Sequence, residues 1–150
     1  MTLDELQWHD RAFADLTGAE LYAILGLRAR VFVVEQACVY QDLDGIDQVS
    51  RHVWAEAGGQ IAAYLRIVPA GMKYAEASIG RVVTAPEARG TGLGRELMRR
   101  GLALAGHEPL RLGAQAYLEK FYVELGFVRA SDVYDEDGIP HLEMTRTAGA

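Results

Sequence analysis

The chain has 150 residues, half of them apolar, and carries a formal net charge of −6 at pH 7. This length and apolar content suffice for one well-buried core, so we expect a single domain over residues 1–150. The acidic balance disfavours a general nucleic-acid binder, because nonspecific binding to phosphate backbones depends on accumulated Lys and Arg.

No apolar run is long enough to span a membrane, and acidic residues such as Asp4 and Asp10 interrupt the first thirty residues. The lone cysteine, Cys38, has no internal partner for a disulfide, and the His and Cys spacings of a zinc site are absent from the sequence. These features predict a soluble cytoplasmic protein with no membrane partner and no metal.

The first predicted element is a helix from about residue 18 into the low thirties. Thr17 and Glu20 have the spacing of a capping box, and apolar residues follow at helical intervals from Leu21 to Phe32. The polar, acid-rich stretch 33–49 predicts a long irregular loop.

Three aspartates of that loop, Asp42, Asp44 and Asp47, superficially have the spacing of a calcium loop. The twelve-residue ligand pattern and its terminal glutamate are not met. We therefore interpret them as a solvated acidic loop, which would suit the edge of a site for a cationic acceptor.

Two β-rich runs, 52–57 and 60–68, flank Gly58-Gly59, which predicts a tight hairpin. The later predicted elements are a strand at 78–84, a helix at 93–105 stopped by Gly106 and Pro109, a strand at 110–114, a helix at 117–125, extended structure from Phe127 through Tyr134, a turn at 136–138 and a strand at 141–145. This order predicts a mixed sheet with flanking helices.

The turn before the second long helix reads Arg89-Gly90-Thr91-Gly92-Leu93-Gly94. A helix start leaves backbone N–H groups unpaired and carries a partial positive charge, and alternate glycines let an anion approach closely. A P-loop is excluded, because Arg95 and Glu96 follow where Lys and Ser/Thr are required. A dinucleotide fingerprint fits poorly, because the spacing is G-x-G-x-G and five residues separate it from the strand.

The turn fits a third pattern, Gln/Arg-x-x-Gly-x-Gly/Ala after a strand, at every defined position. This pattern resembles the pyrophosphate-binding motif of the GNAT superfamily of coenzyme A-dependent N-acyltransferases. The segment Phe121–Phe127 is similar to the Tyr-x-x-x-Gly-Phe segment of the same superfamily. Further stretches that resemble its ElaA-type branch are 28–36, 40–45, 112–116 and 136–141.

The resemblance implies an α/β fold (α+β by some schemes) with a mixed, mostly antiparallel sheet flanked by helices. It implies acetyl-CoA as co-substrate and, as acceptor, a primary amine of a small molecule or a peptide. The coenzyme contacts that it implies are Val82, Val83, Thr84, Arg89, Gly90, Thr91, Gly92, Leu93, Gly94, Arg95 and Gln115. Gln115 stands where an asparagine is common in the superfamily.

Acyl transfer to an amine requires two proton movements. An alkylammonium is only about one part in a thousand neutral at pH 7, so a base or a desolvating pocket must help, or the proton must leave through water, and the departing thiolate needs a proton. Tyr122 occupies the motif position and is predicted to be the acid. The candidates for the base are Glu35, His52 and His141, each of which also has an ordinary structural interpretation.

Other side chains near these motifs have plainer interpretations. Tyr117 and Phe121 are predicted to be packing residues, and Cys38 a buried or idle thiol. Arg95 falls outside the defined motif positions, and with Arg99 and Arg100 it is also compatible with the solvated face of a helix.

Two alternative functions stay open at this point. One is a binding module that keeps the coenzyme fold as a sensor without turnover. The other is acyl transfer from acyl-carrier protein, because residues 28–36 also resemble acyl-homoserine-lactone synthases.

Overall fold

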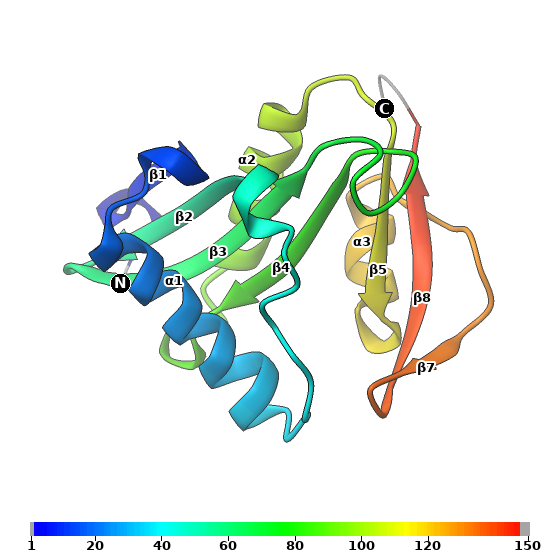
Figure 1. Ribbon diagram of the computed structural model, residues 1–150, viewed down its shortest axis with the longest axis horizontal. Helices are drawn as coiled ribbons and strands as arrows, with labels where there is room; N and C mark the ends of the chain where they lie inside the picture. The colour runs from blue at the N-terminus through cyan, green and yellow to red at the C-terminus, as the bar shows by residue number, and fades with distance from the viewer. Residues whose placement is uncertain (1, 148–150) are drawn as a thin grey trace.

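The computed structural model describes residues 2–147, which form two four-stranded sheets with helices packed against them (Figure 1). In the first sheet the strands follow sequence order as β1 (Gln7–Ala12), β2 (Arg51–Ala57), β3 (Gln60–Val68) and β4 (Ser78–Thr84). In the second sheet β8 (Ile139–Arg146) pairs with β5 (Leu110–Gln115), β6 (Val128–Arg129) and β7 (Tyr134–Glu136). All these strand pairs are antiparallel, so the predicted fold class is confirmed.

Helix α1 (Gly18–Arg28) begins at the predicted capping box. The Thr17 hydroxyl accepts the N–H of Glu20 at 3.1 Å, and the Glu20 carboxylate accepts the N–H of Thr17 at 2.9 Å. The chain continues as a π-helix over Ala29–Glu35, so the helix extends into the low thirties as predicted. Such widened turns are frequent at functional sites, and this one carries Glu35 to the edge of the cavity described below.

Helix α2 (Leu93–Ala105) lies on the face of the first sheet opposite α1, and the short α3 (Glu119–Glu124) lies behind β5 (Figure 1). Gly101 allows α2 to approach β3 closely, since a Cβ there would stand 2.8 Å from Cδ2 of Leu65. Within residues 2–147, none of the helices combines the length and apolarity that a bilayer crossing requires.

The predicted elements differ from the structure in two places. Strand β1 is absent from the predicted elements, because none of its side chains is buried and its partner β2 begins some forty residues later. The irregular loop predicted over 33–49 begins only after Glu35 and ends in a 3₁₀ turn at Asp47–Val49. The remaining strands and helices lie within a few residues of their predicted positions.

The acidic loop is not solvated, and that prediction is wrong. Arg28 and Arg66 are fully buried, and Asp47 accepts hydrogen bonds from Nη1 of both, at 2.7 and 2.9 Å. Asp42 accepts from Nε of Arg28 at 2.8 Å. The whole cluster, called the aspartate network below, comprises Arg28, Arg66, Arg81, Asp42, Asp44 and Asp47.

The aspartate network explains why the loop has a defined shape without regular secondary structure. Its guanidinium groups come from α1, β3 and β4, and its carboxylates all come from the loop. Burial alone would raise the pKa of Asp47, but the hydrogen bonds from Arg28 and Arg66 outweigh burial and lower it. The loop therefore serves to neutralise buried arginines.

Candidate functional site

The two sheets meet at one end only. Ala77 and Leu110 form a parallel bridge, and the N–H of Arg111 donates to the carbonyl of Ala77 at 3.0 Å. Beyond this point, β4 and β5 share no strand pairing among the described residues, and they separate as Figure 1 shows. A cavity of about 650 Å³ lies in the gap, between β4, β5, β8, the π-helix and α3.

Strand β4 bends where it borders this cavity. Its register against β3 shifts between Tyr64 and Arg66, and Arg81 takes a φ of +52°, which is strained for a residue with a side chain. After the bulge, residues 82–84 line the cavity. Because β5 does not pair with this edge of β4, the backbone N–H and C=O groups of β4 can bond an extended ligand.

The glycine turn lies at the same cavity, which Arg89 and Gly94 line. Gly90 and Gly92 have φ values of +78° and +82°, and a Cβ at either position would meet open space. Among residues 2–147, no acceptor takes a hydrogen bond from the backbone N–H groups of residues 90–95. Open donors at the positive end of a helix fit a bound pyrophosphate.

Glu35 is paired with the arginine of this turn. Nη1 of Arg89 donates to the Glu35 carboxylate at 2.8 Å, and this hydrogen bond lowers the pKa of Glu35. A carboxylate with a lowered pKa is a weaker base, which argues against a direct proton-accepting role. Both side chains are more than two-fifths exposed, and exposed ion pairs are weak, so an anion in the turn can compete with Glu35 for Arg89.

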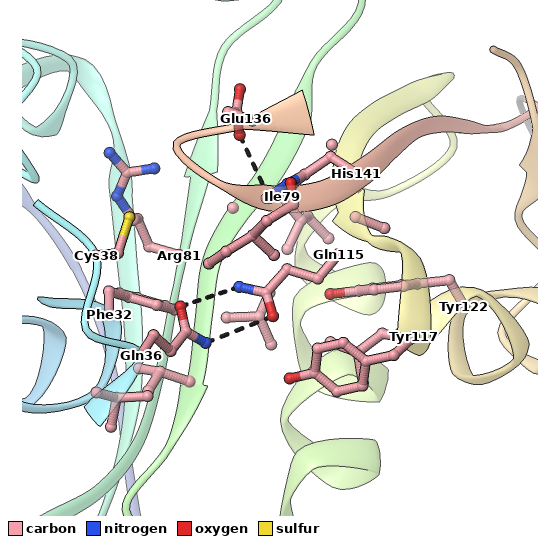
Figure 2. Close-up of a pocket in the computed structure, with 18 of the residues that line it drawn as sticks. Phe32, Gln36, Cys38, Ile79, Arg81, Gln115, Tyr117, Tyr122, Glu136 and His141 are labelled. Carbon is pink, nitrogen blue, oxygen red and sulfur yellow. Dashed lines mark hydrogen bonds and ion pairs between the residues drawn. The ribbon is translucent and has the colours of Figure 1, made fainter. Parts of the chain in front are cut away.

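Tyr122 places its hydroxyl in the cavity, as Figure 2 shows. Its ring is buried and packs edge-on against Phe121 and Phe127, with ring centroids 5.2 and 5.9 Å away. No group within residues 2–147 forms a hydrogen bond with the hydroxyl. Burial raises the pKa of Tyr122, so the phenol keeps its proton throughout the neutral range.

His52 does not reach the cavity, which corrects its prediction as a base. The ring is fully buried, with Nδ1 2.7 Å from the Tyr64 hydroxyl and Nε2 2.9 Å from the carbonyl of Asp47. Burial lowers the pKa of His52, which keeps the ring neutral. Both nitrogens are occupied, so His52 supports the acidic loop rather than a substrate.

His141 does lie in the cavity, opposite Gln115 across the β5–β8 pair. Gln115 exchanges two side-chain hydrogen bonds with Gln36, at 3.1 and 3.4 Å, which connects the end of the π-helix to β5 (Figure 2). This amide pair was not foreseen, because its members are 79 residues apart. Its contact with a coenzyme stays a prediction.

Three further side chains can now be placed. Tyr117 is 74% exposed at the cavity, so its interpretation as a packing residue is wrong. Cys38 is buried at the cavity wall, where burial raises the pKa of its thiol, in line with an unreactive cysteine. Arg95 pairs with Glu124 at 2.6 Å, and its guanidinium lies 5.7 Å from the ring centroid of Phe121, which lines the cavity, so its role in coenzyme binding stays a prediction.

Comparison with known proteins identifies the family. Residues 15–148 match the family model of the acetyltransferase (GNAT) domain. The ElaA protein of Escherichia coli K12 is 41% identical over 147 residues, which cover 94% of this chain and 96% of ElaA.

Two solved structures are similar over nearly their whole length. An acyl-CoA N-acyltransferase from Pseudomonas aeruginosa is 47% identical, with a TM-score of 0.91 and coverage of 95% of this chain and 99% of that one. The crystal structure of E. coli ElaA is 40% identical, with a TM-score of 0.89 and coverage of 94% and 99%.

Proposed function

Because this chain belongs to the acetyltransferase (GNAT) domain family, we propose that it transfers an acetyl group from acetyl-CoA to a primary amine by direct attack in a ternary complex. One observation carries the proposal: the glycine turn, whose N–H groups at residues 90–95 bond nothing within residues 2–147, borders through Arg89 and Gly94 the same cavity as the unpaired hydroxyl of Tyr122. One ligand can therefore place an anionic group against the N–H groups of the turn and a proton-accepting group against the Tyr122 hydroxyl.

The chain has suitable partners along the length of such a ligand. The glycine turn and Arg89 would hold the pyrophosphate, and the free edge of β4 at residues 82–84 would bond the amide-containing arm that follows it. Acetyl-CoA itself supplies the activated thioester. A preformed cleft would position both reactants without a change in the strands.

Tyr122 would act where the thioester sulfur leaves. Its hydroxyl is protonated at neutral pH, since burial raises its pKa, and it has no competing acceptor among the described residues. The phenol can therefore give its proton to the departing sulfur. The ring is fixed by Phe121 and Phe127, which leaves the hydroxyl in one place.

A thiol-release assay with acetyl-CoA and a panel of primary amines, including polyamines and amino-terminal peptides, tests the proposal. Tyr122→Phe is expected to lower kcat at least about a hundredfold while the dissociation constant for acetyl-CoA, measured by calorimetry, stays unchanged. Tyr117→Phe is the matched control, because it removes an exposed cavity hydroxyl, and it should retain most of the activity.

Two outcomes would contradict the proposal. Tight acetyl-CoA binding without thiol release for any amine would favour the sensor function. Transfer from acyl-carrier protein without transfer from acetyl-CoA would favour the carrier-dependent reaction.

A further inference from the structure

The cavity contains an imidazole whose basic nitrogen has no fixed donor. Nδ1 of His141 lies 2.7 Å from the carbonyl oxygen of Ile139. A carbonyl only accepts, so Nδ1 carries the hydrogen and Nε2 keeps its lone pair in the neutral ring. The ring is nearly buried, and it lines the cavity together with Tyr122.

A carboxylate stands beside the basic nitrogen. Oε2 of Glu136 lies 3.4 Å from Nε2 of His141, and Glu136 is more than half exposed. Two acceptors face each other while the ring is neutral, and they become an ion pair once Nε2 takes a proton. The arrangement of carbonyl, imidazole and carboxylate thus fixes the tautomer and stabilises the imidazolium.

The backbone holds this arrangement rigidly. His141 pairs with Tyr134 of β7 across the sheet and stacks on its ring, with centroids 6.2 Å apart. Glu136 and Ile139 flank the tight turn that joins β7 to β8. Figure 2 shows Glu136 and His141 in contact on one wall, with Gln115 and the Tyr122 hydroxyl beyond them.

We infer that His141, supported by Glu136, is the general base that deprotonates the acceptor amine, an inference that rests on the proposed function. Nε2 takes a proton from the acceptor's ammonium group, and the neutral amine then bonds the thioester carbonyl carbon. The carbon–sulfur bond breaks with its electron pair on sulfur, which takes the proton of Tyr122. The amide nitrogen gives its extra proton through solvent to the Tyr122 phenolate and the imidazolium releases its proton to solvent, so one ammonium and one thioester give one amide, one thiol and one proton.

Neither of the other two candidates for the base has a free basic group in the cavity. Glu35 is held by Arg89 at the glycine turn, and His52 is buried away from the cavity. The other charged or titratable side chains that share the cavity wall or touch the His141 ring are Cys38, Tyr40, Lys73, Tyr74, Arg81, Tyr117, Tyr122, Tyr134 and Asp137. Among these side chains of residues 2–147, Glu136 is the group placed to form an ion pair with His141, at 3.4 Å from Nε2.

The main test uses His141→Asn, because an asparagine amide can still donate to the Ile139 carbonyl but cannot accept a proton. We expect kcat/KM for benzylamine to fall at least about a hundredfold at pH 7, with acetyl-CoA affinity unchanged. The loss should be much smaller for methoxyamine, which is largely unprotonated at that pH. His107→Asn, an exposed histidine outside the cavity, is the control and should behave as wild type.

Glu136→Gln provides a second readout that a structural role would not move. A glutamine keeps the size of the side chain but cannot form an ion pair with a protonated ring, so kcat/KM should fall by less than about tenfold for benzylamine, since Glu136 is exposed, and stay near wild type for methoxyamine. A His141→Asn defect of equal size for both amines, or an equal effect of Glu136→Gln on both, would overturn the inference.

Nitrogen NMR of the histidine rings separates this inference from the proposed function, because it needs no turnover. The neutral His141 ring should show the Nδ1–H tautomer in the wild-type protein. The opposite tautomer would overturn the base assignment even in an active enzyme. An inactive wild type that binds acetyl-CoA and shows the Nδ1–H tautomer would instead contradict the proposed function.

Discussion

Two polar regions of this molecule differ in whether their groups already have partners. In the aspartate network, buried guanidinium and carboxylate groups bond one another, and within residues 2–147 Nε of Arg66 is the one buried side-chain nitrogen or oxygen there that lacks a hydrogen-bond partner. In the glycine turn, the N–H groups of residues 90–95 bond nothing in the described chain. The acid-rich loop is the more heavily charged, yet the turn has the free bonding capacity. Unsatisfied polar groups mark a ligand site better than charge does.

Acid should break the ion pairs of the aspartate network before it affects the glycine turn. The pKa values of Asp44 and Asp47 are lowered in the folded protein by their arginine partners, despite burial. Their stabilising effect is therefore full above the unfolded pKa near 4 and is lost as the pH falls through the folded values. Urea titrations should show the free energy of unfolding falling below pH 4, by about 1.4 kcal/mol per pH unit for each extra proton bound on unfolding. A flat profile between pH 4 and pH 2 would contradict the network's role.

Asp47→Ala should lower the free energy of unfolding by about 3–5 kcal/mol, because it leaves Arg28 and Arg66 buried without their shared carboxylate. Asp10→Ala is the matched control. It breaks an exposed pair with Arg51 and should cost less than about 1 kcal/mol. Denaturant unfolding measures both, and equal losses would remove the distinction between buried and exposed pairs.

Gly92→Val tests the glycine turn, where ligand affinity should change more than stability. A branched side chain would fill the open cup and is strained at a φ of +82°, so acetyl-CoA affinity should fall about a hundredfold while stability drops by about 1–2 kcal/mol. Gly59→Val introduces similar strain at a φ of +81° in the β2–β3 turn, away from the cavity. Calorimetry should show unchanged affinity for that control, and an equal loss in both variants would make strain the cause.

Glu35→Gln should have the smallest effect and should sharpen the comparison. It frees Arg89 from its exposed partner, so acetyl-CoA affinity should rise by roughly two- to fivefold at low salt and by less at high salt. A fall in affinity would mean that Glu35 positions Arg89 rather than competing for it.

Much of the fold could be predicted because its signals are local. The capping box at Thr17, the Gly58-Gly59 hairpin and the boundaries of β4 and α2 depend on neighbouring residues, and all lie where predicted. Edge strand β1 could not be found in this way, since it buries no side chain and depends on a distant partner.

In the candidate site, too, the features that depend on neighbouring residues could be predicted and those that depend on distant contacts could not. The glycine turn is a contiguous motif, and its open donors follow from its sequence. The partners of Asp47 and the position of His52 depend on contacts between distant segments, so an acidic loop was interpreted as solvated and a buried histidine as a base. The tautomer of His141 depends on the geometry of a single tight turn, which no spacing in the sequence reveals.

The single bridge between β4 and β5 has a consequence for self-association. Strand edges with free backbone groups usually serve as templates on which a second copy of the chain can add, and repeated addition leads to aggregates. Here the free edges face each other inside a narrow cleft walled by the π-helix and α3. To add to either edge, a strand of a second copy would have to enter the cavity of about 650 Å³ between the two sheets. The fold thus offers these main-chain groups to a guest that fits the cavity and screens them from the edge-to-edge contacts by which chains aggregate.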